Sequence, residues 1–224
     1  MEPFKFIRSL EDLLYEMVIS LILFPVTLVR IVLRPVAMMR VIQQESGEAD
    51  AGHYSDNLNP PLCFLFAIFA AHIAAMPFGA SQIAQSGNAL ARLAMASEEN
   101  TLLFRAATFL IWPAVGALVW RQVARVALDR NLLRPIFYQQ FYLAAPFALL
   151  VSFATSTSAD FVHANFALVT VLMAAAALWF VAAQARVAQA MLRCGALRSW
   201  LTALAILATG GALFIAMMQV AMSV

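Results

Sequence analysis

The sequence predicts an all-α membrane protein: a polytopic bundle of five transmembrane helices, preceded by two N-terminal amphipathic helices that lie in the membrane interface. Hydrophobic residues make up 63% of the 224 residues and charged residues only 12%, against about 45–50% and about 25% in soluble domains. The mean hydropathy is +0.83. A chain this apolar cannot cover its hydrophobic surface with one core, so lipid must solvate part of it.

Twelve of the fourteen basic residues fall in three clusters, which long apolar stretches separate. Lysine and arginine accumulate in the cytoplasmic loops of membrane proteins, so we expect all three clusters to share the cytoplasmic face. This arrangement places the N-terminus in the cytoplasm and the C-terminus in the periplasm. The clusters are Lys5, Arg8, Arg30, Arg34 and Arg40; Arg121, Arg125, Arg130 and Arg134; and Arg186, Arg193 and Arg198.

The N-terminal region, residues 1–42, is expected to form two interfacial helices. Its apolar run, residues 17–29, is short for a membrane span of about 20 residues, and Pro25 interrupts the hydrogen bonding of a helix. The alternative is one true span over residues 13–33, and the sequence leaves it open. The two expected helices cover residues 9–24 and 26–42.

Two pairs of arginines are candidate contacts for lipid headgroups. Arg30 and Arg34 lie four residues apart and therefore share one face of the second interfacial helix. Arg121 and Arg125 repeat this spacing at the end of a predicted span, and guanidinium groups bind phosphate well. A polar, acidic linker without apolar periodicity follows at residues 43–61, and we expect it on the cytoplasmic side.

Five apolar stretches follow the linker, each close to the length that crosses the hydrocarbon of a bilayer. The loop between the first two, residues 79–100, is expected outside the cell and to contain a short amphipathic helix. Pro113 and Pro146 lie within spans, where proline frees a backbone carbonyl and kinks the helix. The spans are 62–78, 102–123, 136–154, 164–185 and 200–222.

Small residues at four-residue spacing let membrane helices approach closely, and three such stripes occur. An alanine-rich chain also produces this spacing by chance, so we expect one or two of the stripes to be real contacts. They are Ala67, Ala71 and Ala75; Ala174–Ala177; and Ala208, Ala212 and Ala216 beside Gly211.

His72 and Arg105 are the candidate functional residues inside the spans. His72 lies ten residues into the first span, roughly 15 Å deep, and either handles a proton or substrate or bonds a neighbouring helix as a structural residue. Arg105 lies one turn inside the outer end of the second span. It either reaches the interface or pairs with Glu98, Glu99 or Asp160, or it binds an anion in an outward-facing site.

Three glutamines mark the cytoplasmic ends of the third and fourth spans: Gln139 and Gln140 open one, and Gln184 closes the other. Together with the neighbouring arginines, they are expected either to line a polar cytoplasmic vestibule or to meet lipid headgroups at the interface.

Enzyme motifs are absent from the sequence, as are phosphate-binding loops. Cys63 and Cys194 are expected at the cytoplasmic face, where thiols stay reduced, and neither has C-x-x-C spacing. His53, His72 and His163 fall on the inside, in the middle and on the outside, so they cannot share a metal. We therefore expect no enzyme activity, no cofactor and no metal, and the charge distribution shows no nucleic-acid footprint.

Two stretches, Phe141–Phe153 with Tyr142 and Pro146, and Ala177–Met191, resemble the Yip family of five-span membrane proteins. The plan of a cytoplasmic N-terminal region followed by closely spaced spans is also similar. The resemblance implies a bundle without catalytic residues. Eukaryotic members of that family are adaptors in membrane traffic, and bacterial relatives are described as permease-like.

These observations together predict a non-enzymatic protein of a bacterial inner membrane, since an arginine- and alanine-rich composition is typical of a GC-rich bacterial genome. It would serve as a scaffold or accessory subunit. Its partners would be membrane lipids and either another membrane protein or a second copy of the chain. A small oligomeric transporter or lipid-handling permease is the alternative that the sequence leaves open.

Overall fold

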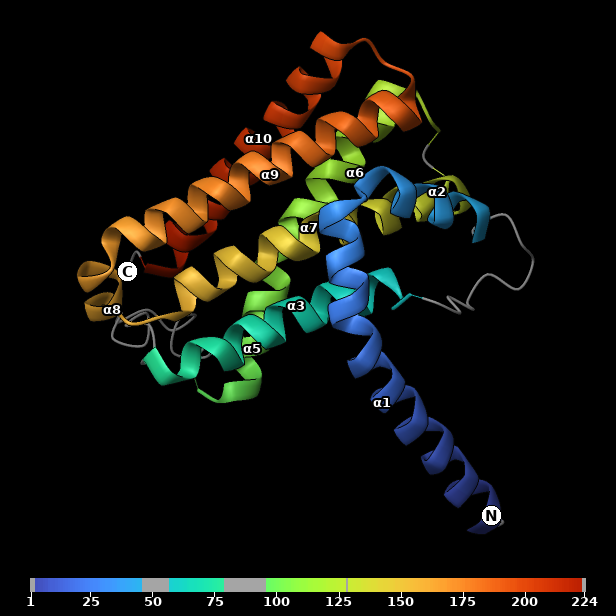
Figure 1. Cartoon of the computed structure of the whole chain (residues 1–224), viewed down its shortest axis with the longest axis vertical. Coiled ribbons are helices and arrows are strands. Elements are labelled where there is room, and N and C mark those ends of the chain that lie inside the picture. The colour runs from blue at the N-terminus through green and yellow to red at the C-terminus, as the bar shows by residue number, and fades with distance from the viewer. Residues whose placement is uncertain (1–2, 46–56, 79–95, 128, 223–224) are drawn as a thin grey trace.

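The computed structural model describes residues 3–45, 57–78, 96–127 and 129–222. Every element in this part of the chain is a helix (Figure 1), which confirms the all-α class. The elements are α1 (Pro3–Leu33), α2 (Pro35–Glu45), α3 (Pro60–Ala75), the 3-10 turn η1 (Met76–Phe78), α5 (Glu98–Phe109), α6 (Ile111–Ala124), α7 (Arg130–Ser156), α8 (Ala159–Ala164), α9 (Phe166–Leu192) and α10 (Ala196–Met222).

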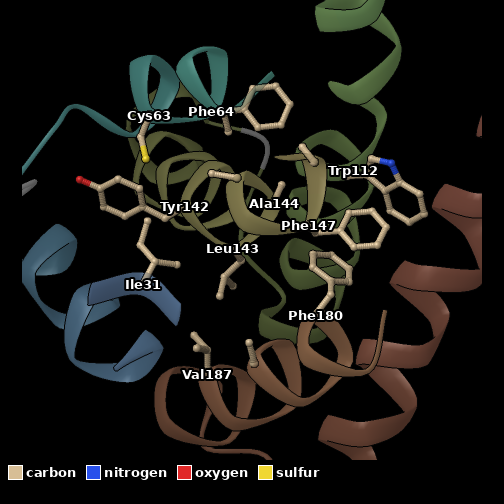
Figure 2. Close-up of a cluster of buried hydrophobic side chains, with 14 of the residues drawn as sticks. Ile31, Cys63, Phe64, Trp112, Tyr142, Leu143, Ala144, Phe147, Phe180 and Val187 are labelled. Atoms are coloured by element: carbon tan, nitrogen blue, oxygen red, sulfur yellow. The ribbon is translucent and has the colours of Figure 1, made fainter. Parts of the chain in front are cut away.

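Helix α7 forms the centre of the bundle, where it packs against α3, α6 and α9, while α10 packs against α9 and α6. The helices α3, α7 and α10 run in one direction, and α6 and α9 run in the other (Figure 1). Tyr142, Leu143 and Phe147 of α7 lie in the middle of the core, between α1, α3, α6 and α9 (Figure 2). The buried surface of the central helix thus holds the bundle together.

Six helical stretches in the described residues are long and apolar enough to cross a membrane. Five of them correspond to the predicted spans, with boundaries that differ by up to seven residues. The protein is therefore a multi-pass membrane protein. The sixth is Tyr15–Leu33, which is the alternative that the sequence left open. The predicted helix within the outer loop falls largely on residues 79–95, which lie outside the described residues.

The predicted division of the N-terminal region at Pro25 is wrong. Helix α1 continues through Pro25, and the break falls at Arg34, immediately before Pro35. A proline restricts the preceding residue away from the helical conformation, whereas its own fixed φ suits the first position of a new helix. Pro35 therefore ends one helix and begins the next, while the single hydrogen bond lost at Pro25 is tolerated.

Only the C-terminal half of α1 is packed against the bundle. Thr27 and Ile31 are fully buried, and the Phe24 ring packs at a tilt against Phe66 of α3 with a ring-centroid distance of 5.9 Å. Towards its N-terminus, α1 leaves the bundle and runs across the direction of α3, α7 and α9 rather than along them (Figure 1). The indole of Trp179 donates to the backbone oxygen of Val32 (3.2 Å), which is one of the carbonyls that the end of α1 leaves free.

The second predicted span is kinked, as the proline within it suggested. Helices α5 and α6 meet at Leu110, and Pro113 lies one turn beyond. The ring of a proline clashes with the carbonyl four residues earlier, which here is that of Phe109. In contrast, α7 runs through Pro135 and Pro146 as one helix.

The small-residue stripes have mixed outcomes. Ala67, Ala71 and Ala75 are all buried between α3 and its neighbours, so this predicted contact is confirmed. The stripe Ala208, Ala212 and Ala216 is exposed, so it is not one of the contacts within the chain. The close approach on α10 occurs at Gly210 instead, where an added Cβ would lie 2.5 Å from the indole of Trp112.

The two neighbouring glycines of α10 offer a matched test of this approach. We expect Gly210→Ala to lower the free energy of unfolding by about 1–3 kcal/mol, because the Cβ would displace the buried Trp112. Gly211→Ala should be neutral or stabilising, since its Cβ would lie no closer than 3.8 Å to Trp112 and alanine favours a helix by about 1 kcal/mol. Reversible unfolding in detergent measures both, and equal effects of the two substitutions would contradict the packing.

Candidate functional site

At the end of the bundle that lacks the arginine clusters, His72 of α3 meets Glu98 at the start of α5. The His72 Nε2 and Glu98 Oε2 atoms lie 2.9 Å apart. The His72 side chain is 11% exposed, whereas the Glu98 side chain is 76% exposed. Glu98 therefore connects a buried imidazole to the aqueous phase, and the pair becomes an ion pair when His72 is protonated.

Helix α5, which lies at this end of the bundle, carries polar residues along one side. Glu98, Thr101, Arg105 and Thr108 follow one another at intervals of three or four residues, so they lie on one side of the helix. Thr101 and Thr108 are buried. The Ser97 hydroxyl begins the helix by accepting a hydrogen bond from the Asn100 backbone N–H (3.1 Å), which places Glu98 in the first turn.

Arg105 is placed inward from Glu98 along this face. Its Nη1 atom is buried and has no hydrogen-bond partner among the described residues. The Glu98 carboxylate, one of the three acids predicted as partners of Arg105, bonds to His72 instead. We call His72, Glu98 and Arg105 the outer cluster.

A small cavity lies beside the Arg105 side chain, with a volume of about 30 Å³. Three helices build its wall, which is almost entirely apolar although Arg105 and two threonines contribute to it. Its lining residues are Phe104, Arg105, Thr108, Phe109, Thr155, Phe214 and Met218. The arrangement places a half-buried arginine beside a small apolar cavity.

Two of the predicted glutamines form a buried amide pair between α7 and α9. The Gln184 Nε2 group donates to Gln140 Oε1 (2.7 Å), and the Gln140 Nε2 group donates to Gln184 Oε1 (3.5 Å). Gln140 is 1% exposed and Gln184 is fully buried. Both alternatives for these residues, an open vestibule and headgroup contact, are wrong, because the two amides satisfy each other inside the bundle.

Gly116 of α6 makes room for this pair, since a Cβ there would lie 2.1 Å from Gln140 Oε1. The neighbouring Gln139 is also buried and donates to the backbone oxygen of Met39 on α2 (3.5 Å). The three glutamines thus connect α7 to α9 and to α2, and their role is to fix how the helices pack.

A second polar contact fastens α1 to the segment before α3. Arg30 Nη1 donates to Asn57 Oδ1 (2.9 Å), and the Leu58 backbone N–H donates to Thr27 Oγ1 (3.0 Å). The Leu58 backbone oxygen accepts from the hydroxyl of buried Tyr142. Both backbone groups of Leu58 are therefore satisfied by side chains from α1 and α7.

The four candidate lipid contacts lie in different surroundings. Arg30 bonds within the protein, as described, and Arg34 is exposed at the break between α1 and α2. Arg121 is half-buried, and Arg125 is exposed at the left-handed C-cap of α6 with φ 54°. Whether any of them binds lipid stays a prediction.

The described residues hold no group of three or more metal-ligating side chains that could hold a metal. Cys63 is buried, Cys194 is half-buried and both are free thiols. His53 lies outside the described residues. Sequence reasoning missed the polar face of α5, although the spacing of Glu98, Thr101 and Thr108 in an otherwise apolar span is a detectable signal.

Comparison with known proteins adds no relative: no family model, no curated protein and no solved structure matches this chain. The resemblance to the Yip family therefore stays a prediction.

The buried amide pair predicts energetic coupling between α7 and α9. Gln140→Met and Gln184→Met should each lower the free energy of unfolding by about 1–3 kcal/mol, because each leaves the other amide unsatisfied. The double variant should lose less than the sum, with a coupling energy of about 0.6–1.7 kcal/mol. Unfolding in detergent supplies the four values.

The matched control replaces Gln139, the adjacent buried glutamine that bonds to α2. Gln139→Met combined with Gln184→Met should be additive, since these two side chains have separate partners. Additivity of the Gln140 and Gln184 substitutions would refute the pair.

Proposed function

We propose that the protein is a non-enzymatic scaffold or accessory subunit of a bacterial inner-membrane complex, with α1 as its assembly helix. One observation carries the proposal: the part of α1 beyond its packed end has an apolar surface that the rest of the chain does not cover. The exposed side chains there are Tyr15, Met17, Val18, Ile19, Leu21 and Ile22.

The direction of α1 favours a helix in the membrane interface rather than a sixth span. It runs across the five other apolar helices (Figure 1), on the side where the arginines of α2, α6, α7, α9 and α10 gather. Glu16, Ser20, Thr27 and Arg30 lie along one narrow face of α1, because their spacings of 4, 7 and 3 residues repeat the helical period. Thr27 and Arg30 turn this face towards the bundle, so the opposite, apolar face of α1 is left for the membrane.

With α1 in the interface, the five spans place every arginine cluster on the cytoplasmic face and the C-terminus in the periplasm. The outer cluster then lies near the periplasmic surface. The cytoplasmic arginines remain the groups best placed to meet anionic lipid headgroups, particularly exposed Arg34 and Arg125.

The exposed apolar side chains of α1 and of the outward face of α3 together form a docking surface. The outward face of α3 bears an open, apolar hollow of about 350 Å³, lined by Leu62, Leu65, Phe66 and Phe69, and Phe66 also touches Phe24 of α1. Met17 and Leu21 precede Phe24 at helical spacing and extend this surface along α1. We assign its occupant as a transmembrane helix of another membrane protein.

The transporter alternative is less well supported by the interior of the bundle. The rings of Trp112, Phe147 and Phe180 pack edge to face or tilted, at centroid distances of 4.7 and 4.8 Å (Figure 2). Along their helices, these rings lie between the outer cluster and the buried glutamine pair. Dense packing there favours a structural bundle over a permeation path.

Photo-crosslinking in native membranes tests the assembly role. A photoreactive side chain at Leu21 or Phe69 should capture the same partner protein, because both positions line the proposed surface. The matched control is Leu178 of α9, which is 72% exposed on a different helix and should yield lipid adducts alone. Mass spectrometry identifies the captured chain and separates a second copy of this protein from another subunit.

Lipid adducts alone from Leu21 and Phe69, or the same protein bands from all three positions, would rule out the docking surface. Capture of a second copy would replace the assigned partner with a homo-oligomer.

A further inference from the structure

Helices α6 and α9 both end on an arginine in the left-handed backbone conformation. Arg125 has φ 54° and ψ 37°, and Arg193 has φ 51° and ψ 34°. They are the only two non-glycine residues in the described part of the chain with a positive φ. Glycine is the usual residue where a helix ends in this conformation, and a Cβ costs free energy there. The chain therefore keeps arginine at both ends against the preference of the backbone.

The two arginine side chains are not used for contacts within the described residues. Both are exposed, and neither has a hydrogen bond or ion pair with another described residue. The helix dipole alone does not require Arg125, because Arg121 already places a cation in the last turn of α6. A strained conformation that persists without an internal contact points to a function of the side chain. Both guanidinium groups are thus available to a ligand outside the chain.

The ends of α6 and α9 meet the start of α10 at one corner of the bundle (Figure 1). The Arg198 Nη2 group, in the first turn of α10, donates to the Val123 backbone oxygen (3.4 Å). Val123 lies two residues before Arg125, and Arg193 lies three residues before α10 begins. We call Arg125, Arg193 and Arg198 the arginine corner.

We propose that the arginine corner binds the phosphate of an anionic phospholipid. Helices α6, α9 and α10 belong to apolar stretches long enough to span the membrane, so their ends lie at the level of the headgroups. Trp200, which is 45% exposed beside the corner, is a residue type that accumulates at this level. Guanidinium groups bind phosphate oxygens through charge-assisted, bidentate hydrogen bonds.

An apolar stripe on α10 favours a lipid over a soluble phosphate as the source of this group. Leu197, Leu201 and Leu204 follow one another at intervals of four and three residues and therefore share one side of the helix. They are 75%, 57% and 50% exposed. The acyl chains of a phospholipid held at the corner can lie along this stripe, whereas a soluble phosphate gains nothing from it.

This inference goes beyond the assembly role of α1 and does not depend on it, because α1 contributes no residue to the corner. It requires only that the ends of α6, α9 and α10 lie at a membrane surface.

Thermal unfolding of the purified full-length protein in neutral detergent tests the site. Phosphatidylglycerol should raise Tm by about 3–5 °C for each tenfold increase in its mole fraction above half-saturation. Phosphatidylcholine, whose headgroup has no net charge, should raise Tm less at the same mole fraction. Equal shifts with the two lipids would overturn the inference.

The double variant Arg125→Gly with Arg193→Gly separates lipid binding from a structural role. Without lipid, its Tm should equal that of the wild type or exceed it by up to about 4 °C, because glycine suits both helix ends. Its response to phosphatidylglycerol should be lost. Retention of the full response would overturn the inference, whatever the Tm without lipid.

Arg40→Gln is the matched control, since it removes an exposed arginine of α2 and should leave the lipid response intact. An equal loss in this variant would show that overall positive charge attracts the lipid and would refute a site at the corner. Native mass spectrometry of the wild-type protein adds a measurement without variants. The protein should retain phosphatidylglycerol at collision energies that remove phosphatidylcholine, and loss of both lipids together would count against the site.

A soluble arm distinguishes the two sources of phosphate. Glycerol phosphate at constant ionic strength should leave Tm unchanged in the absence of lipid. If it stabilises the wild-type protein in a saturable way and the double glycine variant does not respond, the corner takes a soluble phosphate and the lipid assignment is wrong.

Discussion

A guanidinium group cannot rest in hydrocarbon without a partner, and this constraint organises the whole bundle. The basic residues of α6, α7, α9 and α10 lie at the helix ends that face one side (Figure 1), and the Arg198 side chain reaches across to the Val123 backbone oxygen (3.4 Å). The long helices α7, α9 and α10 therefore each run from an end with arginines to an end without them. Arg105 is the described exception, and the structure places a cavity beside it.

The same reasoning applies to uncharged polar groups. The Gln140 and Gln184 amides satisfy each other, and Gly116 leaves space for them. Both backbone groups of Leu58 find side-chain partners, one of which is Tyr142 of the central helix. Since lipid offers no competing hydrogen bonds, these contacts decide which helices touch and hold the N-terminal region in place. The apolar residues then fill the remaining space.

The number and positions of the five central helices were predictable, because length, hydropathy and arginine placement are properties of single segments. The contacts between pairs of helices were less predictable from the sequence. The amide pair needs two residues 44 positions apart to meet, and the exposed Ala208 stripe shows that spacing does not reveal which face is covered. The helix break was misplaced because Pro25 and Pro35 look alike in sequence. Pro35 ends α1, whereas the helix tolerates Pro25.

Labelling single cysteines with a membrane-impermeant thiol reagent tests the central constraint most directly. In a Cys194→Ser background, cysteines replace Ala127 after α6, Ala196 at the start of α10, and Ala164 at the end of α8; all three are exposed. The account predicts that the first two react from the cytoplasmic face only, and that the third reacts from the periplasmic face. Reaction of Ala127→Cys and Ala196→Cys from opposite faces would contradict it.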